Sequence, residues 1–208
     1  MNRAGVLLLT AVALPIALAG AGPRLFFSRN FPGSLPAYIQ VTVEKTGEVE
    51  YREAVDEDLP VKSKLSPADT EAIFGLAEKL DYFKRPLETQ VKVAFMGTKT
   101  FRYEDGSQKM EVQFNYSQDA AAQALLDWFE RMAETAQNRI SLERAVKYDH
   151  LGVMKALLAL AASLDRGRLA GPEQFLPLLD RVATNEVYMH TARARAAELA
   201  ETIRGPKK

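Results

Sequence analysis

The sequence predicts an α+β protein: an antiparallel sheet of four to five strands, packed on one face by two helices and followed by a C-terminal helical bundle. Within residues 91–116, apolar and polar residues alternate on both sides of an Asp105-Gly106 turn, which is the pattern of a β-hairpin. A second alternating segment covers residues 38–55. From Ile140 onward, apolar residues recur only at helical spacing, which predicts the bundle.

Composition and charge limit the classes of protein. The chain has 208 residues, of which 47% are hydrophobic, so a disordered protein is excluded. Formal net charge is zero, but residues 37–135 carry −7 and residues 136–208 carry +4. This split favours two oppositely charged parts packed against each other, with an anion-binding basic part as the alternative. The chain has no cysteine, which excludes disulfides and cysteine-based catalysis.

Residues 1–21 are predicted to be a secretory signal peptide. Arg3 precedes a short apolar run, and Ala17-Leu18-Ala19 fits the small-x-small cleavage pattern. The run is about 15 residues long, whereas a membrane span takes about 20, so cleavage is expected and retention as an anchor is the alternative. The mature protein is then exported, to the periplasm or the cell exterior. Residues 22–36, which mix Gly, Pro and Ser, are predicted to be a linker.

Residues 37–138 are predicted to form the α+β domain. Its first hairpin covers residues 38–55, and a polar connection follows over residues 56–65. Ser66-Pro67-Ala68-Asp69 is a helix start, because serine caps, proline suits the first position and aspartate completes a capping box. Apolar residues then continue at helical spacing as far as Phe83.

The second half of this domain is predicted to contain a strand, the hairpin and a helix. Residues 91–95 alternate as a short strand that bends at Gly97 into the hairpin. A long helix is expected over residues 119–138. Three of its residues should be buried against three of the hairpin: Leu125, Trp128 and Phe129 against Phe101, Val112 and Phe114.

Residues 139–208 are predicted to form a helical bundle that shares the core of the sheet. One short helix follows Ser141, another follows Leu151, a third is kinked or starts late because of Pro177, and Asn185 caps the last. The last two helices resemble a hairpin of the HEAT or armadillo kind, on the residues Leu179, Ala183, Ala192, Ala196 and Leu199. A solenoid needs at least three repeats, so a small bundle is predicted instead.

Four features, taken in order, resemble a family of uncharacterised bacterial exported domains. They are the strand Gly47-Glu48-Val49-Glu50-Tyr51, the helix start Leu65-Ser66-Pro67, the Gly106 hairpin and the Trp128 helix. These match the family's GxVxY strand, LS helix and dG hairpin over residues 37–135. Members often carry Asp-x-Pro-Thr before the hairpin, where this chain has Phe95-Met96-Gly97-Thr98. The resemblance implies export and no particular activity.

The two histidines, His150 and His190, are the first candidates for chemistry. Asp149 precedes His150 at a predicted helix start, where its simplest role is an N-cap, and sequence neighbours do not face each other on a helix. Glu186 and His190 are four residues apart on the predicted last helix, but a metal site needs about four ligands or three plus water. No catalytic, metal or cofactor-binding residue is therefore predicted.

Two further motifs were weighed for anion binding. Gly97-Thr98-Lys99-Thr100 resembles the end of a phosphate loop, but it lacks the earlier glycine and a strand follows where a helix is needed. Arg181, Arg193, Arg195 and Arg204 form a possible basic stripe for anionic lipid or acidic partners. Aromatic residues do not interleave with them, which excludes a nucleic-acid partner.

Two functional hypotheses follow. The first is an exported non-enzymatic binding or structural module, whose partner is an envelope protein or another envelope component. The missing catalytic constellation favours it. The alternative is a periplasmic hydrolase or small-ligand-binding protein with a cleft between sheet and helical bundle, near His150, Asp149 or His190. No cofactor, and no stable membrane span after signal cleavage, is expected.

Overall fold

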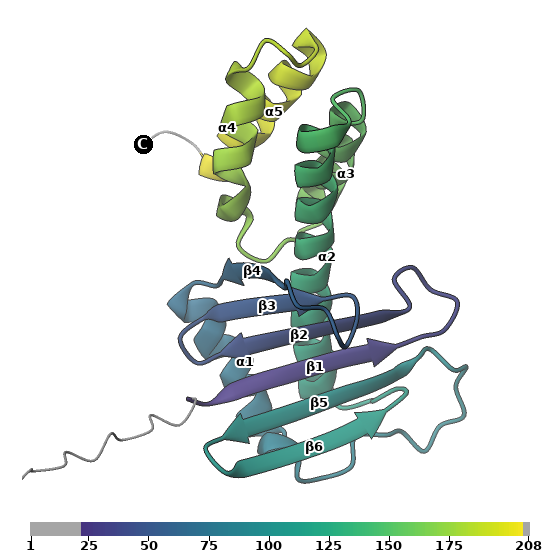
Figure 1. Cartoon of the computed structure of the whole chain (residues 1–208). Coiled ribbons are helices and arrows are strands. Elements are labelled where there is room, and N and C mark those ends of the chain that lie inside the picture. The colour runs from purple at the N-terminus through teal and green to yellow at the C-terminus, as the bar shows by residue number, and fades with distance from the viewer. Residues whose placement is uncertain (1–21, 206–208) are drawn as a thin grey trace, which may run out of the picture.

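The computed structural model describes residues 22–205, which form a six-stranded antiparallel sheet with helices on one face and a helical extension beyond one edge (Figure 1). The strand order is β4-β3-β2-β1-β5-β6. The strands are β1 (Arg24–Asn30), β2 (Tyr38–Glu44), β3 (Glu48–Arg52), β4 (Val61–Lys64), β5 (Thr98–Asp105) and β6 (Gln108–Phe114). The predicted α+β class is confirmed, with six strands instead of four to five.

The helices are α1 (Pro67–Lys79), α2 (Ala120–Tyr148), α3 (Val153–Asp165), α4 (Leu176–Thr184) and α5 (His190–Arg204), with short 3-10 helices η1 (Asp81–Phe83) and η2 (Pro172–Phe175). α1 and α2 cover one face of the sheet, and α2 runs on past the β4 edge into the bundle (Figure 1). Because α2 is continuous over 29 residues, the predicted helix end at residue 138 and the separate helix after Ser141 are wrong.

β1 corrects the predicted linker over residues 22–36. Leu25 and Phe27 are fully buried and alternate with partly exposed residues, as in a strand with one covered face. β1 pairs with β2 on one side and with β5 on the other along its whole length. Pro32, Gly33, Ser34 and Pro36, which made the segment look like a linker, belong to the loop that follows the strand. An N-terminal segment of the described chain is therefore the middle of the sheet.

Two other segments differ from the prediction. Residues 61–64, predicted as a polar connection, form the edge strand β4. An edge strand pairs on one side only and can carry side chains that stay partly or fully in water, so a polar sequence is compatible with it. Residues 91–95, predicted as a strand, form a loop in which Val91 and Phe95 are more than half exposed. Alternation alone did not reveal whether a neighbouring strand was present to pair with this segment.

An aromatic core holds α2 against the sheet. The ring of Phe129 stacks on that of Phe27 with centroids 5.0 Å apart. Leu125 and Phe129 are fully buried, which confirms their predicted positions. The predicted burial of Trp128 is wrong: its ring lies at the margin of the core, half-buried, with the Arg131 guanidinium 4.5 Å from the ring centroid.

A tight turn ends α1 four residues earlier than the predicted end at Phe83. The helix stops at Lys79, and all three residues of η1 have positive φ, which reverses the chain. The turn places two aromatic rings on β5: Tyr82 lies 4.5 Å from Tyr103, and Phe83 lies 5.3 Å from Phe101, measured between centroids. Packing of these rings offsets the strain of the turn.

The sheet face turned away from the helices is charged and well paired. The Arg24 guanidinium lies 2.5 Å from the Glu104 carboxylate, which is also 2.8 Å from Arg102. The Arg102 guanidinium lies 3.8 Å from the ring centroid of Phe26. Cations and carboxylates thus compensate each other across neighbouring strands on this outer face.

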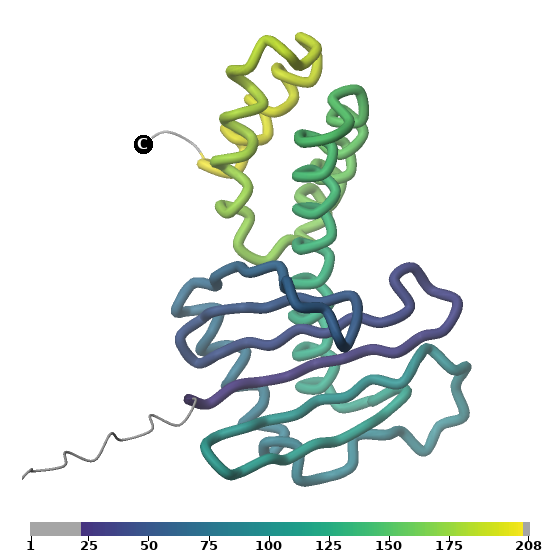
Figure 2. The backbone as a smooth tube through the Cα atoms, viewed as in Figure 1, coloured from purple at the N-terminus to yellow at the C-terminus, as the bar shows by residue number. Residues whose placement is uncertain are grey.

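The C-terminal helices have a core of their own, so the predicted shared core is wrong. Leu142 at the end of α2 packs with Leu157 of α3, Leu179 of α4 and Leu199 of α5, apart from the aromatic core. The extension of α2 carries this bundle beyond the edge of the sheet. In Figure 2 only the connection between α3 and η2 returns to the β4 edge, where Gly171 lies beside the backbone of Lys64.

The starts of the last two helices test two capping predictions. Pro177 lies in the first turn of α4, which confirms the late start. Asn185 does not cap α5: it follows α4, and its side-chain oxygen accepts a hydrogen bond from the Val187 N–H. Across residues 22–205, none of the helices is both long and apolar enough to cross a membrane. The predicted signal peptide lies outside the described residues.

Candidate functional site

The residues singled out from the sequence lie on the surface of the bundle. His150 is exposed in the turn after α2, with its ring edge-on to Tyr188 at 5.3 Å between centroids. Asp149 ends α2 and accepts a hydrogen bond from a backbone N–H before α3. Glu186 lies in the turn before α5, so the predicted helix face shared with His190 is wrong. Within the described residues, no group of three or more potential ligands is placed to hold a metal ion.

The predicted basic stripe is partly neutralised. Arg204 binds both carboxylate oxygens of Asp180 at 2.7 Å. Arg195 donates to Glu198 on the same helix. Among the described residues, Arg181 and Arg193 have no ion pair, so part of the positive charge of the stripe stays uncompensated.

A pocket opens where the ends of β1, β5 and β6 meet the first turns of α2. Its volume is about 350 Å³. This lies at the lower end of the range for small-molecule sites, roughly 300–1,000 Å³. Its walls are mainly apolar, and the apolar side chains lining it include Phe31, Met96, Phe114, Ala122 and Leu126.

Two cations face each other at the head of this pocket. Alternate residues of a strand share a face, so Arg29 lies on the covered face of β1 with Phe27, and Lys99 on the covered face of β5 with Phe101. The register places Arg29 directly opposite Lys99. Like charges in directly opposed positions destabilise a sheet. This arrangement is therefore a local cost to the fold.

Within the part of the chain that the structure describes, Lys99 is buried without a carboxylate partner. Its side chain lines the pocket, and the residue is only 5% exposed. The Nζ donates to the carbonyl oxygen of Asn115 at 2.7 Å and, at longer range, to those of Met96 at 3.3 Å and Gly97 at 3.5 Å. Burial lowers the pKa of the ammonium; Glu130 acts against this shift and Arg29 adds to it.

Arg29 is also poorly matched. Its guanidinium lies 3.9 Å from the Glu130 carboxylate, at the outer limit of an ion pair. Among the described residues, its buried Nε has no hydrogen-bond partner. Glu130 is shared, because it also lies 3.8 Å from Arg168. One distant carboxylate therefore serves two guanidinium groups while Lys99 receives none directly.

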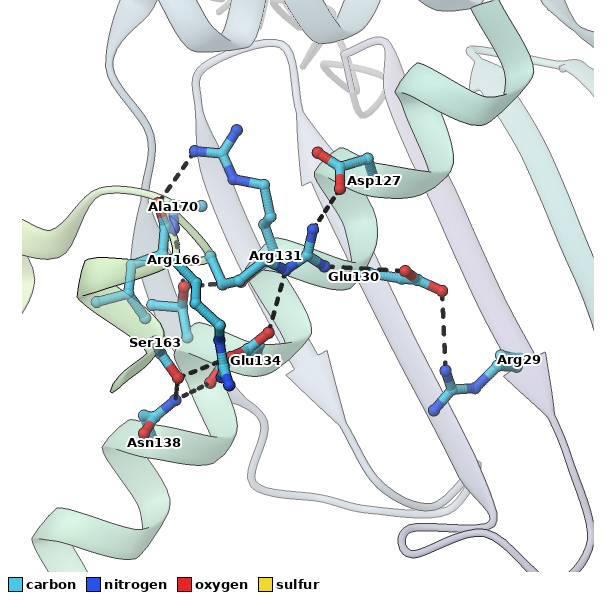
Figure 3. Close-up of polar contacts among 12 residues, drawn as sticks. Arg29, Asp127, Glu130, Arg131, Glu134, Asn138, Ser163, Arg166 and Ala170 are labelled. Atoms are coloured by element: carbon cyan, nitrogen blue, oxygen red, sulfur yellow. Dashed lines mark hydrogen bonds and ion pairs between the residues drawn. The ribbon is translucent and has the colours of Figure 1, made fainter. Parts of the chain in front are cut away.

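Beyond Glu130, a dense polar cluster fastens the bundle to α2 (Figure 3). Arg168, in the connection after α3, binds Asp127 and lies 3.3 Å from Glu134. Glu134 also accepts hydrogen bonds from Ser163 at 2.7 Å and from Arg166 at 3.2 Å. Burial raises the pKa of Glu134, but the hydrogen bonds from Ser163, Arg168 and Arg166 outweigh it, so the net pKa is lowered.

The backbone of the same connection is anchored as well. The Thr135 hydroxyl accepts from the Ala170 N–H at 2.9 Å and donates to the Arg131 carbonyl at 2.7 Å. Arg131 in turn donates to the Leu169 carbonyl at 3.1 Å. Most of these polar groups have a partner, although among the described residues the buried Nε of Arg131 has none. The cluster is best explained as a structural joint between the sheet layer and the bundle.

Neither pocket cation is predicted as a site residue from the sequence. Arg29 fell in the predicted linker, and Lys99 was considered only as part of a phosphate-loop motif. The strand expected after that motif is confirmed as β5. One signal was available: extending the alternation of Phe101 and Tyr103 back by two residues places Lys99 on the apolar face.

Comparison with known proteins adds no assignment: the sequence matches no protein-family model and no curated protein. The resemblance over residues 37–135 to bacterial exported domains therefore stays a prediction. The function has to be inferred from the geometry of the site.

Proposed function

We propose that the protein is an exported, non-enzymatic binding module and that the apolar pocket beside Lys99 is its ligand site. The observation that carries the proposal is an open pocket of about 350 Å³ with apolar walls and an opposed cation pair at its head. Open apolar space and unpaired buried charge both lower the stability of a folded protein. Their presence together in this pocket therefore favours a binding role for it.

The rim of the pocket supports the proposal. Met96 lines the pocket and is 42% exposed, and the neighbouring Phe95 is 58% exposed with its ring against Phe31. Exposed apolar side chains beside an apolar pocket offer additional surface for a ligand to bury. Gly97 fixes this loop: its φ is +90°, and a Cβ there would lie 2.7 Å from the Cβ of Phe31.

Binding is favoured over catalysis by the surroundings of Lys99. A lysine nucleophile needs a neutral amine and a base within hydrogen-bond reach. In the described part of the chain, the hydrogen-bond partners of Lys99 are carbonyl oxygens, which favour the ammonium form. The nearby carboxylate of Glu130 is engaged with Arg29 and Arg168.

Export is the part of the proposal that rests on residues 1–21. Their charge, apolar run and Ala17-Leu18-Ala19 support a cleaved signal peptide. N-terminal sequencing of the protein isolated from its own cells should give a start near Gly20 or Gly22. An intact Met1 in a soluble cytoplasmic fraction would contradict export and leave the pocket proposal unaffected.

The pocket is tested with a neutral apolar fluorophore, N-phenyl-1-naphthylamine. The purified protein should bind it saturably, with increased fluorescence as the dye leaves water. Leu126→Trp fills the pocket and should abolish most of the signal, because Leu126 is a wall residue. Leu158→Trp is the matched control, since Leu158 is an exposed leucine of α3 in the bundle.

Both variants are first checked for unchanged circular dichroism and melting temperature. The proposal fails if the wild-type protein gives no saturable signal. It also fails if Leu126→Trp binds the dye as well as Leu158→Trp, because the dye would then occupy another surface.

A further inference from the structure

We propose that the ligand is an amphipathic anion: a medium-chain carboxylic acid whose carboxylate binds between Arg29 and Lys99 and whose alkyl tail fills the pocket. This inference rests on the proposed binding role of the pocket and adds the chemistry of the ligand's head group. Three features of the site support it: its charge balance, the state of its hydrogen-bond donors and the composition of its walls.

The charge balance at the head of the pocket is positive. Arg29 and Lys99 contribute two cations on opposed strand positions, and Glu130 is the one carboxylate lining the same pocket. Glu130 lies 3.9 Å from Arg29 and 3.8 Å from Arg168, so its charge is divided. Figure 3 shows Glu130 between Arg29 and the cluster around Glu134. Buried cations are stable when paired, and a bound anion would complete this pairing.

One donor at this position is unused within the described chain, and two of the Lys99 hydrogen bonds are long. Among the described residues, the buried Nε of Arg29 has no acceptor. Of the three contacts made by the Lys99 Nζ, one is short at 2.7 Å and two are long, at 3.3 and 3.5 Å. A carboxylate has two oxygens and accepts from both cations at once, forming charge-assisted hydrogen bonds.

The walls distinguish an acid with a tail from other ligands. Below the cations the pocket is lined by Phe114, Ala122 and Leu126, which an inorganic anion would leave unfilled. A neutral apolar ligand would fill the walls but leave the cation pair uncompensated. A volume of about 350 Å³ is enough for a short or medium alkyl chain.

The test compares octanoate with 1-octanol, which have the same number of carbons and differ in the head group. Binding is measured by displacement of N-phenyl-1-naphthylamine from the purified protein near neutral pH. Octanoate should bind at least about tenfold more tightly than octanol, the ratio expected of one charge-assisted hydrogen bond. Lys99→Met should remove this preference while octanol binding is kept.

Two further variants keep the test decisive. Arg29→Gln should reduce the preference for octanoate independently, in case Lys99→Met alters the fold. Lys109→Met is the matched control, because Lys109 is an exposed lysine at the start of β6. It should retain the wild-type preference.

The outcomes separate this inference from the function beneath it. Equal binding of octanoate and octanol to the wild-type protein would contradict the proposal that the ligand is an anion. The proposal of an apolar binding site would not be affected. Preferential octanoate binding that survives both Lys99→Met and Arg29→Gln overturns the position assigned to the carboxylate. If neither compound displaces the dye, the anion proposal is wrong; if the dye itself does not bind, the pocket proposal is wrong too.

Discussion

Arg168 and Lys99 are two cations near the same helix residue, Glu130 of α2, and they differ in their partners. Arg168 contacts three carboxylates, those of Asp127, Glu130 and Glu134. Lys99 is more deeply buried and contacts only backbone carbonyls, with Arg29 directly opposite. The comparison shows that polar groups which hold this architecture together are matched within the chain. Those at the pocket are left for another molecule to match.

The difference has consequences for stability. Removing one member of a matched cluster leaves the other members buried and uncompensated, which is costly. Removing one member of an opposed cation pair takes away a repulsion and a desolvation cost. Substitutions in the two places should therefore change the free energy of unfolding in opposite directions.

Arg168→Met should have the larger effect. It leaves the carboxylates of Asp127, Glu130 and Glu134 close together on one face of α2 without their shared cation. Breaking a fully buried pair costs roughly 3–5 kcal/mol. Because the Arg168 side chain is 28% exposed, solvent screening reduces the expected loss to about 2 kcal/mol. Urea denaturation measures this loss as a lower midpoint with an unchanged slope.

Arg166→Met is the matched control for this change. Arg166 contacts Glu134 alone in the same cluster and is 65% exposed, so its loss should cost well under about 1 kcal/mol. Equal destabilisation by the two substitutions would mean that the cluster is a solvated surface network. The proposed joint between sheet and bundle would then have to be abandoned.

The fold was predictable where its signals are local. The hairpins β2–β3 and β5–β6 and the start of α1 follow from alternation, turn residues and the cap at Ser66, all within short segments. β1 was missed because a loop over residues 31–37 that contains Pro32, Gly33 and Pro36 separates it from its hairpin neighbour β2, and because its other partner, β5, lies far along the sequence. Residues 91–95 were wrongly predicted to be a strand for the converse reason. Their large apolar residues alternate with Lys92 and Ala94, but within the described residues no strand pairs with them.

The candidate site depends on contacts that no local pattern contains. Arg29 and Lys99 come from distant parts of the sequence, and their opposition follows from the register between β1 and β5. Trp128 shows the same limit within a helix, because helical spacing placed it near the buried face but did not reveal that it lies at the margin of the core. The separate core of the bundle depends on the full length of α2, which the sequence divided into two helices.

Lys99→Met should have the smaller effect, and in the opposite direction. At pH 7 the variant should be at least as stable as the wild-type protein, because methionine fills similar space without burying a charge opposite Arg29. Loss of the hydrogen bond to the Asn115 carbonyl limits the gain. A variant that is stable but has lost the preference for octanoate would identify Lys99 as a residue retained for binding at some cost to the fold.

The pH dependence of the free energy of unfolding tests whether burial of the Lys99 ammonium causes the expected difference between the wild-type protein and Lys99→Met. Burial lowers the pKa of Lys99 in the folded protein below its ordinary 10.5, so the unfolded chain binds more protons between these two values. Wild-type stability should therefore gain from Lys99 as pH rises through this window, while at lower pH the cost of burying the ammonium is fully present. Denaturant unfolding of both proteins from pH 7 to 10 should show the stability advantage of Lys99→Met shrinking as the pH approaches 10.5.

Lys109→Met, a substitution of an exposed lysine, is the control and should show no such trend. A Lys99→Met protein that is clearly less stable at pH 7, with a pH curve parallel to the wild type, would mean that Lys99 is a structural group and that the contrast with Arg168 does not hold.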